Sequence, residues 1–214
     1  MKRVCGKIIA FDGPDGVGKT TQIGLTAAYL RECGYDVHTT RASGGTPIGE
    51  RLREVSLSEL TRPAEVDVYI SLAMHTALGH DLQMRRSKGQ ICLVDRSPAA
   101  IVAYNVYGSQ LEDKQLGLDA FRKMLDLWDT DLLLMINAGQ DVTDDRRKKR
   151  TDKPMDYFEK QNASYHLRVR QGYKKAIELI MRNREQHNML EEIDGSPSKT
   201  HVQQQIKNSI QKVL

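Results

Sequence analysis

The sequence has no long hydrophobic run and no strong excess of charge, and these absences narrow its class. No stretch of about 18 apolar residues is present, which is the length that a membrane helix needs. Residues 1–7 lack the apolar segment of a secretory signal. The net charge of +4 is small and scattered, which suits phosphate handling better than nucleic-acid binding. We therefore expect a soluble, cytoplasmic protein that binds neither membranes nor nucleic acid.

Cysteine is also scarce. Cys5, Cys33 and Cys92 are odd in number and widely separated, with neither CxxC spacing nor a nearby histidine pattern. Disulfide frameworks and zinc sites need paired or closely spaced ligands. We expect reduced thiols that pack as small apolar groups.

The hydrophobic pattern predicts an α/β fold in a single domain, residues 1–214. Short, continuous apolar segments alternate with segments whose apolar residues recur at helical spacing. Such strands are typical of a parallel sheet with helices on both faces. We expect five strands, at residues 7–12, 35–40, 91–94, 132–136 and 189–193. This arrangement is a doubly wound, five-stranded parallel sheet.

The helices are expected between these strands. Ile23, Ala27 and Leu30 mark the first helix, and residues 118–128 form another. A last helix follows the fifth strand. The longest helix begins at Pro63 and ends near residue 88. One of its faces carries Val66, Ile70, Ala73 and Ala77.

A further helix is predicted in the C-terminal third. Asp156 and Glu159 have the spacing of a capping box. Behind them, Tyr165, Val169 and Ala176 form an apolar stripe at helical spacing. The pattern predicts that this helix begins at Asp156.

The strongest motif lies between the first strand and the first helix. Residues 13–20, GPDGVGKT, fit the pattern GxxxxGK[ST] in full. Glycines let backbone N–H groups surround phosphate oxygens, while the lysine reaches the β- and γ-phosphates. We expect ATP to be bound by Gly13, Asp15, Gly16, Gly18, Lys19, Thr20 and Thr21.

A carboxylate for Mg²⁺ is expected at the end of the third strand. There Asp95 occupies the position of a Walker B acid, and Thr20 offers its hydroxyl to the same ion. The fourth strand ends in Asn137 and offers no acid, although Asp95 could also cap a helix. A guanine-reading NKxD segment and an Asp-x-x-Gly turn after this Mg²⁺-binding strand are both absent, which argues against a GTPase switch. Instead Arg96 follows Asp95, and a guanidinium there could hold a second anionic substrate.

Four blocks of sequence resemble the thymidylate kinase family. The first is the phosphate-binding loop with its flanks, and the second resembles the family's Thr-Arg-Glu-Pro-Gly-Gly-Thr-Pro stretch. The third has an Asp-Arg pair and a later Ala-Tyr pair, and the fourth leads into the helix near the C-terminus. These blocks are residues 11–21, 40–50, 95–104 and 156–173.

The resemblance implies roles for individual residues. Arg41 and Arg96 would hold the acceptor's phosphate, with Gly44 and Gly45 close to it, and Asp15 would bind the acceptor's sugar hydroxyl. Because Gly16 stands where some members carry a catalytic arginine, that function would fall to a lid. The lid is placed at about residues 141–156 and includes the basic run RRKKR, with Arg146 and Arg150 as catalytic candidates. By itself, this run could equally be a solvated helix face or a nucleic-acid patch.

The sequence departs from the family pattern around the acceptor's base. Ala42 and Ser43 replace Glu-Pro, and Asn105 follows Tyr104 where glutamine is usual. The family's base-reading arginine falls near Met74 or His75, and its stacking phenylalanine near Ile70. We expect Tyr104, Asn105, Ile70 and Met74 to contact the substrate, with a base pocket that differs from the usual one.

The residues and the resemblance together predict an ATP- and Mg²⁺-dependent nucleoside monophosphate kinase, with dTMP or a related deoxynucleoside monophosphate as acceptor. A homodimer through the long helix after Pro63 is also implied by the resemblance. Two alternatives remain at this point. One is a deoxynucleoside kinase, which would need a carboxylate base near Asp12. The other is an ATP-binding module without turnover.

Overall fold

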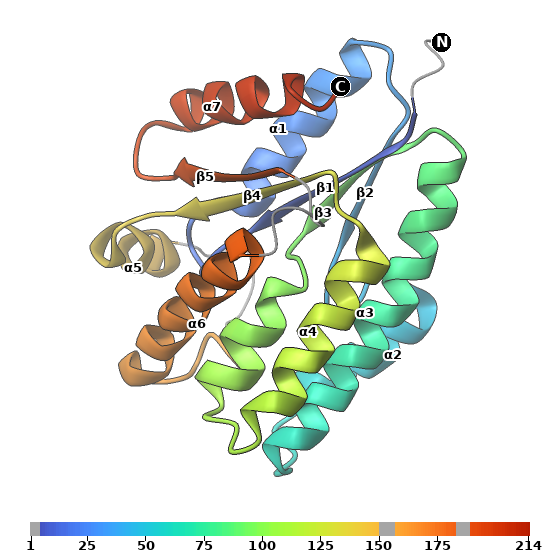
Figure 1. Ribbon diagram of the computed structural model, residues 1–214. Helices are drawn as coiled ribbons and strands as arrows, with labels where there is room; N and C mark the ends of the chain where they lie inside the picture. Colours follow the sequence, from blue (N-terminus) through green and yellow to red (C-terminus); the bar gives the residue numbers. More distant parts are fainter. Residues whose placement is uncertain (1–4, 150–156, 183–188) are drawn as a thin grey trace.

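A five-stranded sheet forms the centre of the protein (Figure 1). The computed structural model describes residues 5–149, 157–182 and 189–214, without the side chains of 147–149. The elements in chain order are β1 (Lys7–Asp12), α1 (Lys19–Glu32), β2 (Val37–Arg41), α2 (Pro47–Ser56), α3 (Ala64–Ser87), β3 (Ile91–Asp95), the π-helix η1 (Ile101–Gly108), α4 (Lys114–Trp128), β4 (Leu132–Asn137), α5 (Gln140–Lys149), α6 (Ala163–Arg182), β5 (Met189–Asp194) and α7 (Lys199–Gln211).

The sheet has the order β2-β3-β1-β4-β5, and every neighbouring pair is parallel. Its inner strands are continuously apolar: Ile8 to Phe11 of β1 and Ile91 to Val94 of β3 are almost completely buried. A strand that is covered by helices on both faces has no solvent-exposed side, so its residues are apolar throughout. The predicted fold class is therefore confirmed.

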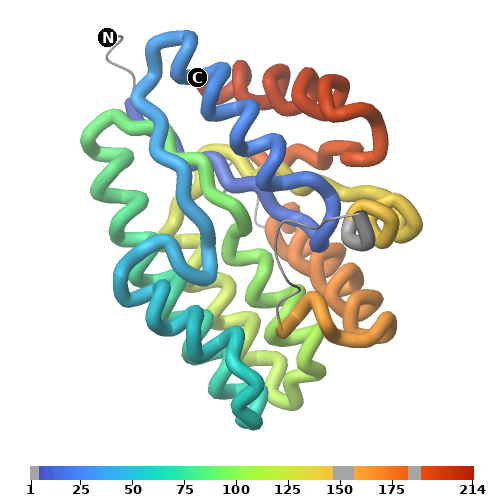
Figure 2. Tube along the Cα trace, turned by 180° about the vertical axis from the view of Figure 1, so that it is seen from behind, coloured from blue at the N-terminus to red at the C-terminus, as the bar shows by residue number. Residues whose placement is uncertain are grey.

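Helices cover the two faces of the sheet, and the two views show them separated (Figures 1 and 2). On one face, α1 and α7 pack with β1, β3 and β4 in a single apolar cluster, to which Ile23 and Ile206 belong. On the other face, η1, α4 and α6 contribute Val102, Phe121 and Tyr173 to a second cluster. α3 packs beside α4, where Leu78 contacts a third cluster that contains Trp128.

The π-helix η1 is an element that the sequence pattern does not predict. Seven of its eight residues are buried, so its apolar residues show no helical period. Helical periodicity arises when one face of a helix is buried and the other is exposed. A helix that is buried on all sides therefore has no such pattern. Its backbone lies between α4 and α6, directly after the turn that follows β3.

In α3, the predicted apolar face is not the face that packs on the core. Val66 and Ala73 are exposed, whereas Val68, Met74 and Leu78 are buried. This helix is apolar on more than one side, so the spacing alone cannot say which side meets the sheet. Ile70 and Ala77 are half-buried.

The start of α6 also differs from the prediction. Asp156 lies outside the described residues, and the helix begins only at Ala163. Its first turn is capped by Asn162, whose Oδ1 accepts a hydrogen bond of 2.9 Å from the Tyr165 backbone N–H. The helix that carries the apolar stripe therefore begins later than predicted, with Asn162 as its cap, while the predicted pairing of Asp156 with Glu159 lies outside the described residues.

Two further findings concern composition. Cys92 is buried as expected, whereas Cys5 and Cys33 are exposed. Within the described residues, none of the helices combines the length and apolar character that a membrane span needs.

Candidate active site

The parallel register gathers the functional strand ends at one edge of the sheet. Asp95, the last residue of β3, pairs with Arg41 on β2 and with Phe11 on β1. Asp12 and the phosphate-binding loop follow Phe11 directly. Residues far apart in the sequence thus meet where open α/β sheets bind their ligands, at the carboxyl ends of the strands.

The phosphate-binding loop has the backbone geometry that its glycines predict. Gly13, Gly16 and Gly18 have φ angles of 131°, 84° and 101°. At Gly13 a Cβ would also collide with the Ile136 carbonyl oxygen. Lys19 donates hydrogen bonds of 2.8 and 3.0 Å to the carbonyls of Gly13 and Pro14. The ammonium group is therefore held inside the curve of the loop.

The electrostatics of Lys19 reflect its crowded position. Burial lowers the pKa of Lys19, and the nearby Arg96 guanidinium lowers it further, while Asp15, Asp95 and Asp12 raise it. The net shift is downward. Additional negative charge, such as phosphate oxygens, would favour the charged form of this lysine.

Thr20 and Asp95 form a pair of oxygen ligands on the cavity. The Thr20 hydroxyl donates a hydrogen bond of 2.9 Å to Asp95 Oδ2. Mg²⁺ commonly binds one or two protein oxygens together with substrate phosphates. The described residues contain no cluster of three His, Cys, Asp or Glu side chains that could hold a metal alone. The pair therefore fits an ion that arrives with a nucleotide.

Arg96 is held by groups from three segments. Its Nη2 is 2.5 Å from Asp15 Oδ1, its Nη1 donates a hydrogen bond of 2.8 Å to the Tyr173 hydroxyl, and its guanidinium lies 4.7 Å from the Tyr104 ring centroid. The Arg96 backbone has a φ of 77°, a conformation that typically costs about 1–3 kcal/mol in a residue with a side chain. Such strain at a ligand-binding edge indicates a position fixed for function.

Asp15 is the ion-pair partner of Arg96. Burial by itself would raise the pKa of Asp15, but the charges of Arg96 and Lys19 and the hydrogen bonds from Tyr104 and Arg96 lower it well below its usual range. The Tyr104 hydroxyl donates to Asp15 Oδ2 at 2.8 Å. Asp15 and Tyr104 therefore form a hydrogen-bonded pair beside Arg96.

Asp12 is a central residue of the site. From the sequence alone it is only a weak candidate for the base of a deoxynucleoside kinase. It is completely buried, and its carboxylate accepts four hydrogen bonds. The donors are the Gly13 N–H (2.8 Å), the Tyr173 hydroxyl (2.7 Å), and the N–H (2.8 Å) and hydroxyl (2.6 Å) of Ser97. The available signal was the acidic residue placed at the end of an otherwise apolar strand.

A second arginine site forms between β2 and α2. Arg41 Nη2 lies 2.7 Å from Glu50 Oε2, while Glu50 Oε1 accepts a 2.7 Å hydrogen bond from the Gly45 N–H. That backbone hydrogen bond is the main cause of the lowered pKa of Glu50, and Arg41 adds to it. Ser43, between them, has a φ of 59°. Glu50 is the last residue of the second resembling block, which implies no role for it; the available signal is an acidic residue in the first turn of α2.

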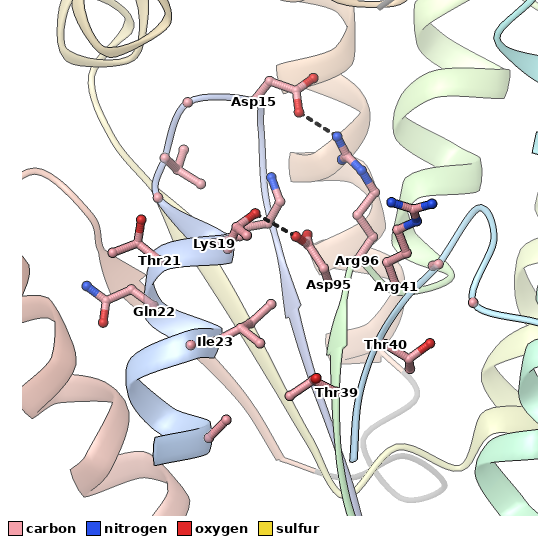
Figure 3. Close-up of a pocket in the computed structure, with 18 of the residues that line it drawn as sticks. Asp15, Lys19, Thr21, Gln22, Ile23, Thr39, Thr40, Arg41, Asp95 and Arg96 are labelled. Carbon is pink, nitrogen blue, oxygen red and sulfur yellow. Dashed lines mark hydrogen bonds and ion pairs between the residues drawn. The ribbon is translucent and has the colours of Figure 1, made fainter. Parts of the chain in front are cut away.

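One cavity of about 1470 Å³ connects most of these groups, and Figure 3 shows Lys19, Asp95, Arg96 and Arg41 around it. Gly44 lies beside it, next to Glu50 and Arg41. The predicted residues that line it are Asp15, Gly16, Gly18, Lys19, Thr20, Thr21, Arg41, Gly45, Asp95, Arg96 and Arg146.

The residues expected at the substrate that do not line this cavity are Gly44, Ile70, Met74, Tyr104 and Asn105, although Tyr104 reaches it indirectly through its hydrogen bond to Asp15. Ile70 is half-buried on α3, and Met74 and Asn105 are 1% and 5% exposed. His75, the other candidate for reading the base, is also buried. Its Nδ1 hydrogen-bonds the Ser71 carbonyl oxygen at 2.8 Å, and its ring packs against Trp128. The structure therefore does not bring the predicted base-reading residues to the cavity.

The predicted lid begins in α5. Arg146 donates hydrogen bonds of 3.2 and 3.0 Å to the carbonyls of Val17 and Gly195 and lines the cavity. Arg150 lies outside the described residues.

Comparison with known proteins agrees with this arrangement. The family model described as Thymidylate kinase matches residues 11–206. A thymidylate kinase of Thermomicrobium roseum is 33% identical over 171 residues, covering 79% of this chain and 80% of the relative. The thymidylate kinase of Bartonella quintana is 32% identical over 219 residues, covering 98% and 97%.

A solved structure extends the comparison to the fold. The crystal structure of a thymidylate kinase from Ehrlichia chaffeensis superposes with a TM-score of 0.70 and covers 96% of this chain and 98% of its own, at 23% identity. The family match spans nearly the whole sequence, and it includes the phosphate-binding loop and the Asp95–Arg96 pair described above. This chain belongs to the thymidylate kinase family of phosphotransferases.

Proposed function

We propose that this protein transfers the γ-phosphoryl group of ATP to dTMP or a closely related deoxynucleoside monophosphate. One observation carries the proposal: a phosphate-binding loop and two arginines from other strands face the same cavity. A nucleoside triphosphate on the loop and a monophosphate on the arginines would present their phosphates to each other. Such positioning is the main contribution that kinases make to phosphoryl transfer.

On the donor side, Lys19 and the backbone N–H groups of residues 13–20 would bind the triphosphate. Thr20 and Asp95 would hold Mg²⁺, which offsets negative charge on the phosphates when it is bound. Their hydroxyl and carboxylate oxygens, already 2.9 Å apart, support this assignment.

On the acceptor side, Arg41 and Arg96 would bind the monophosphate, with Gly44 and Gly45 next to it. Arg41 is half-exposed on the cavity, and its partner Glu50 restricts its orientation. A guanidinium has five N–H groups, so Arg96 retains donors besides the two bound to Asp15 and Tyr173. Asp15 would receive the sugar hydroxyl, next to Tyr104.

The transfer needs no covalent enzyme intermediate. An oxygen of the acceptor phosphate attacks the γ-phosphorus in line, and ADP leaves. Lys19, Arg96 and a lid arginine would stabilise the charge on the transferred group. The placement of Arg146 on the cavity supports its role as that lid residue.

Neutralising Arg146, Arg147 and Arg150 tests the lid. We expect kcat to fall more than ATP affinity in the open state, because closure brings these charges to the reacting group. A rise in KM for ATP alone would assign the run to ATP binding instead.

A panel of acceptors tests the reaction itself. The protein is incubated with ATP, Mg²⁺ and either nucleosides or their monophosphates, and new phosphate esters are measured. We expect monophosphates to be phosphorylated far better than nucleosides, since two guanidinium groups would lose an anionic partner in a nucleoside complex. dTMP should be accepted, with dUMP or another monophosphate competing. A strict preference for nucleosides would refute the proposal.

The alternatives are less well supported. A deoxynucleoside kinase needs a base that faces a sugar hydroxyl, but both Asp12 oxygens already accept hydrogen bonds from protein donors. A module that only binds ATP does not need the second arginine site, because no acceptor phosphate has to be bound. Absence of any product in the panel would favour that module.

We also propose a single catalytic unit that forms a homodimer through α3 in the cytoplasm, where its nucleotide substrates occur. Val66 and Tyr69 on α3 are 38% and 57% exposed, and Leu60 before it is 68% exposed. Exposed large apolar groups that lie close together are typical of interfaces. Light scattering should give a dimer for the wild type and a monomer for Tyr69→Lys, whereas a monomeric wild type would contradict the assembly.

A further inference from the structure

We propose that Tyr173 is a positioning residue that orients Arg96 toward the acceptor phosphate. This inference rests on the proposed function and assigns a role to a residue of α6 that lies outside the phosphate-binding loop and the cavity lining. The Tyr173 hydroxyl stands between two charged groups: it accepts from Arg96 Nη1 at 2.8 Å and donates to Asp12 Oδ1 at 2.7 Å.

The chemistry of the three groups fixes the direction of both hydrogen bonds. An arginine can only donate and an ionised carboxylate can only accept, whereas a hydroxyl can do both. Arg96 Nη1 and Asp12 Oδ1 are 4.0 Å apart, which is too far for a direct hydrogen bond. The hydroxyl of Tyr173 therefore supplies a link that the two charges cannot make alone.

The anchor behind this link is rigid. Asp12 is fully buried, and its other donors come from the start of the phosphate-binding loop and from Ser97, next to Arg96. The Arg96 backbone is held as well, because its N–H donates to the Phe11 carbonyl oxygen at 2.7 Å. With its backbone held, its Nη1 bonded to Tyr173 and its Nη2 paired with Asp15, Arg96 has few orientations left.

Close helix packing places Tyr173 at this point. Gly172 lies against η1, where a Cβ would come within 2.6 Å of the Ala103 Cα and 2.9 Å of the Tyr107 Cβ. The absence of a side chain at this residue lets α6 approach η1 closely. The next residue then reaches across to Asp12 and Arg96, with its ring 3% exposed.

The same helix provides a matched control. Tyr165 is also buried, at 6% exposure, but its hydroxyl has no hydrogen-bond partner among the described residues. Tyr173→Phe and Tyr165→Phe remove the same atom from two buried rings of α6. Only the first removes a contact to Arg96.

The experiment measures steady-state kinetics with dTMP and ATP. We expect Tyr173→Phe to raise KM for dTMP by about tenfold or more, the effect typical of losing a hydrogen bond to a charged group. KM for ATP should change less than about twofold, and Tyr165→Phe should leave both constants near wild type. A structural role would instead lower thermal stability without separating the two substrates.

A double-mutant cycle identifies Arg96 as the residue through which Tyr173 acts. Binding of dTMP is measured by calorimetry for the wild type, Tyr173→Phe, Arg96→Lys and the double variant. We expect Tyr173→Phe to weaken binding in the wild-type background and to add little in the Arg96→Lys background. If Tyr173→Phe weakened dTMP binding by the same factor in both backgrounds, the inference would be overturned.

The remaining outcomes separate the inference from the proposed function. Equal behaviour of the two Tyr→Phe variants in an active enzyme would refute only the positioning role. The same holds if Tyr173→Phe no longer folds at the assay temperature while Tyr165→Phe does, since the hydroxyl would then be structural. A wild-type protein that neither binds nor phosphorylates any monophosphate would refute the proposed function, and the inference with it.

Discussion

Replacing Asp12 with asparagine should destabilise the protein strongly although the side chain keeps its size. Each carboxylate oxygen accepts from one backbone N–H and one hydroxyl: Gly13 and Tyr173 on one side, and both donors of Ser97 on the other. The asparagine amide places its own N–H groups on one of these two sides, whichever way the side chain is turned, so the donors on that side face another donor. A hydroxyl can rotate to accept from the amide, but a backbone N–H cannot.

The magnitude follows from this geometry. At least one buried backbone N–H loses its acceptor, which typically costs about 1–3 kcal/mol. The remaining hydrogen bonds become weaker, because their acceptor is no longer a charged carboxylate. We therefore expect the free energy of unfolding to fall by about 2–4 kcal/mol. In a chain of this size, that corresponds to a Tm lower by roughly 5–15 °C.

Urea unfolding followed by circular dichroism measures the effect, with Asp113→Asn as the control. Asp113 is exposed and caps α4 through a single hydrogen bond of 3.2 Å from the Leu116 N–H. Asparagine caps helices about as well as aspartate, so the control should stay within about 0.5 kcal/mol of wild type. If Asp12→Asn is no more destabilising than this control, the carboxylate does not organise the site as described.

Two further predictions concern activity and thiol chemistry. Lys19→Ala should lower kcat at least about 100-fold with little change in Tm, since the side chain lines the cavity; a variant retaining more than a hundredth of the activity would contradict this role. Cys5 and Cys33 are exposed and should react with a thiol reagent in the folded protein. Burial raises the pKa of Cys92 to about 12, so at pH 8 its thiolate is scarce and it should react only after unfolding; rapid labelling of all three thiols would argue against the buried position.

The sheet and the phosphate-binding loop could be predicted because their signals are local. Each strand is a continuous apolar segment, and the loop glycines precede Lys19 at fixed spacing. Parallel pairing then requires that the strand ends share one edge of the sheet, which is where Arg41 and Asp95 lie as register partners.

Other features depend on contacts that the sequence does not display. The face of α3 that packs on the sheet could not be chosen, since Val66 and Val68 are equally apolar and the choice depends on where neighbouring helices leave space. Tyr173 is only the last residue of the fourth block of the resemblance, with no role implied for it, and only tertiary packing brings its hydroxyl to Asp12. The substrate's base pocket was predicted from the resemblance to the family pattern, and Ile70, Met74 and Asn105 do not line the cavity.

The loop at Ser43 limits which consensus substitutions from related sequences can be introduced into this chain. Substitution toward a family consensus often stabilises proteins, and proline is the consensus residue suggested by the resemblance at this position. Proline fixes φ near −65°, whereas Ser43 has a φ of 59°, and its carbonyl oxygen accepts a 2.8 Å hydrogen bond from Arg53. Consensus engineering would therefore have to exchange the whole segment between β2 and α2, because proline at residue 43 alone is incompatible with the backbone conformation found there.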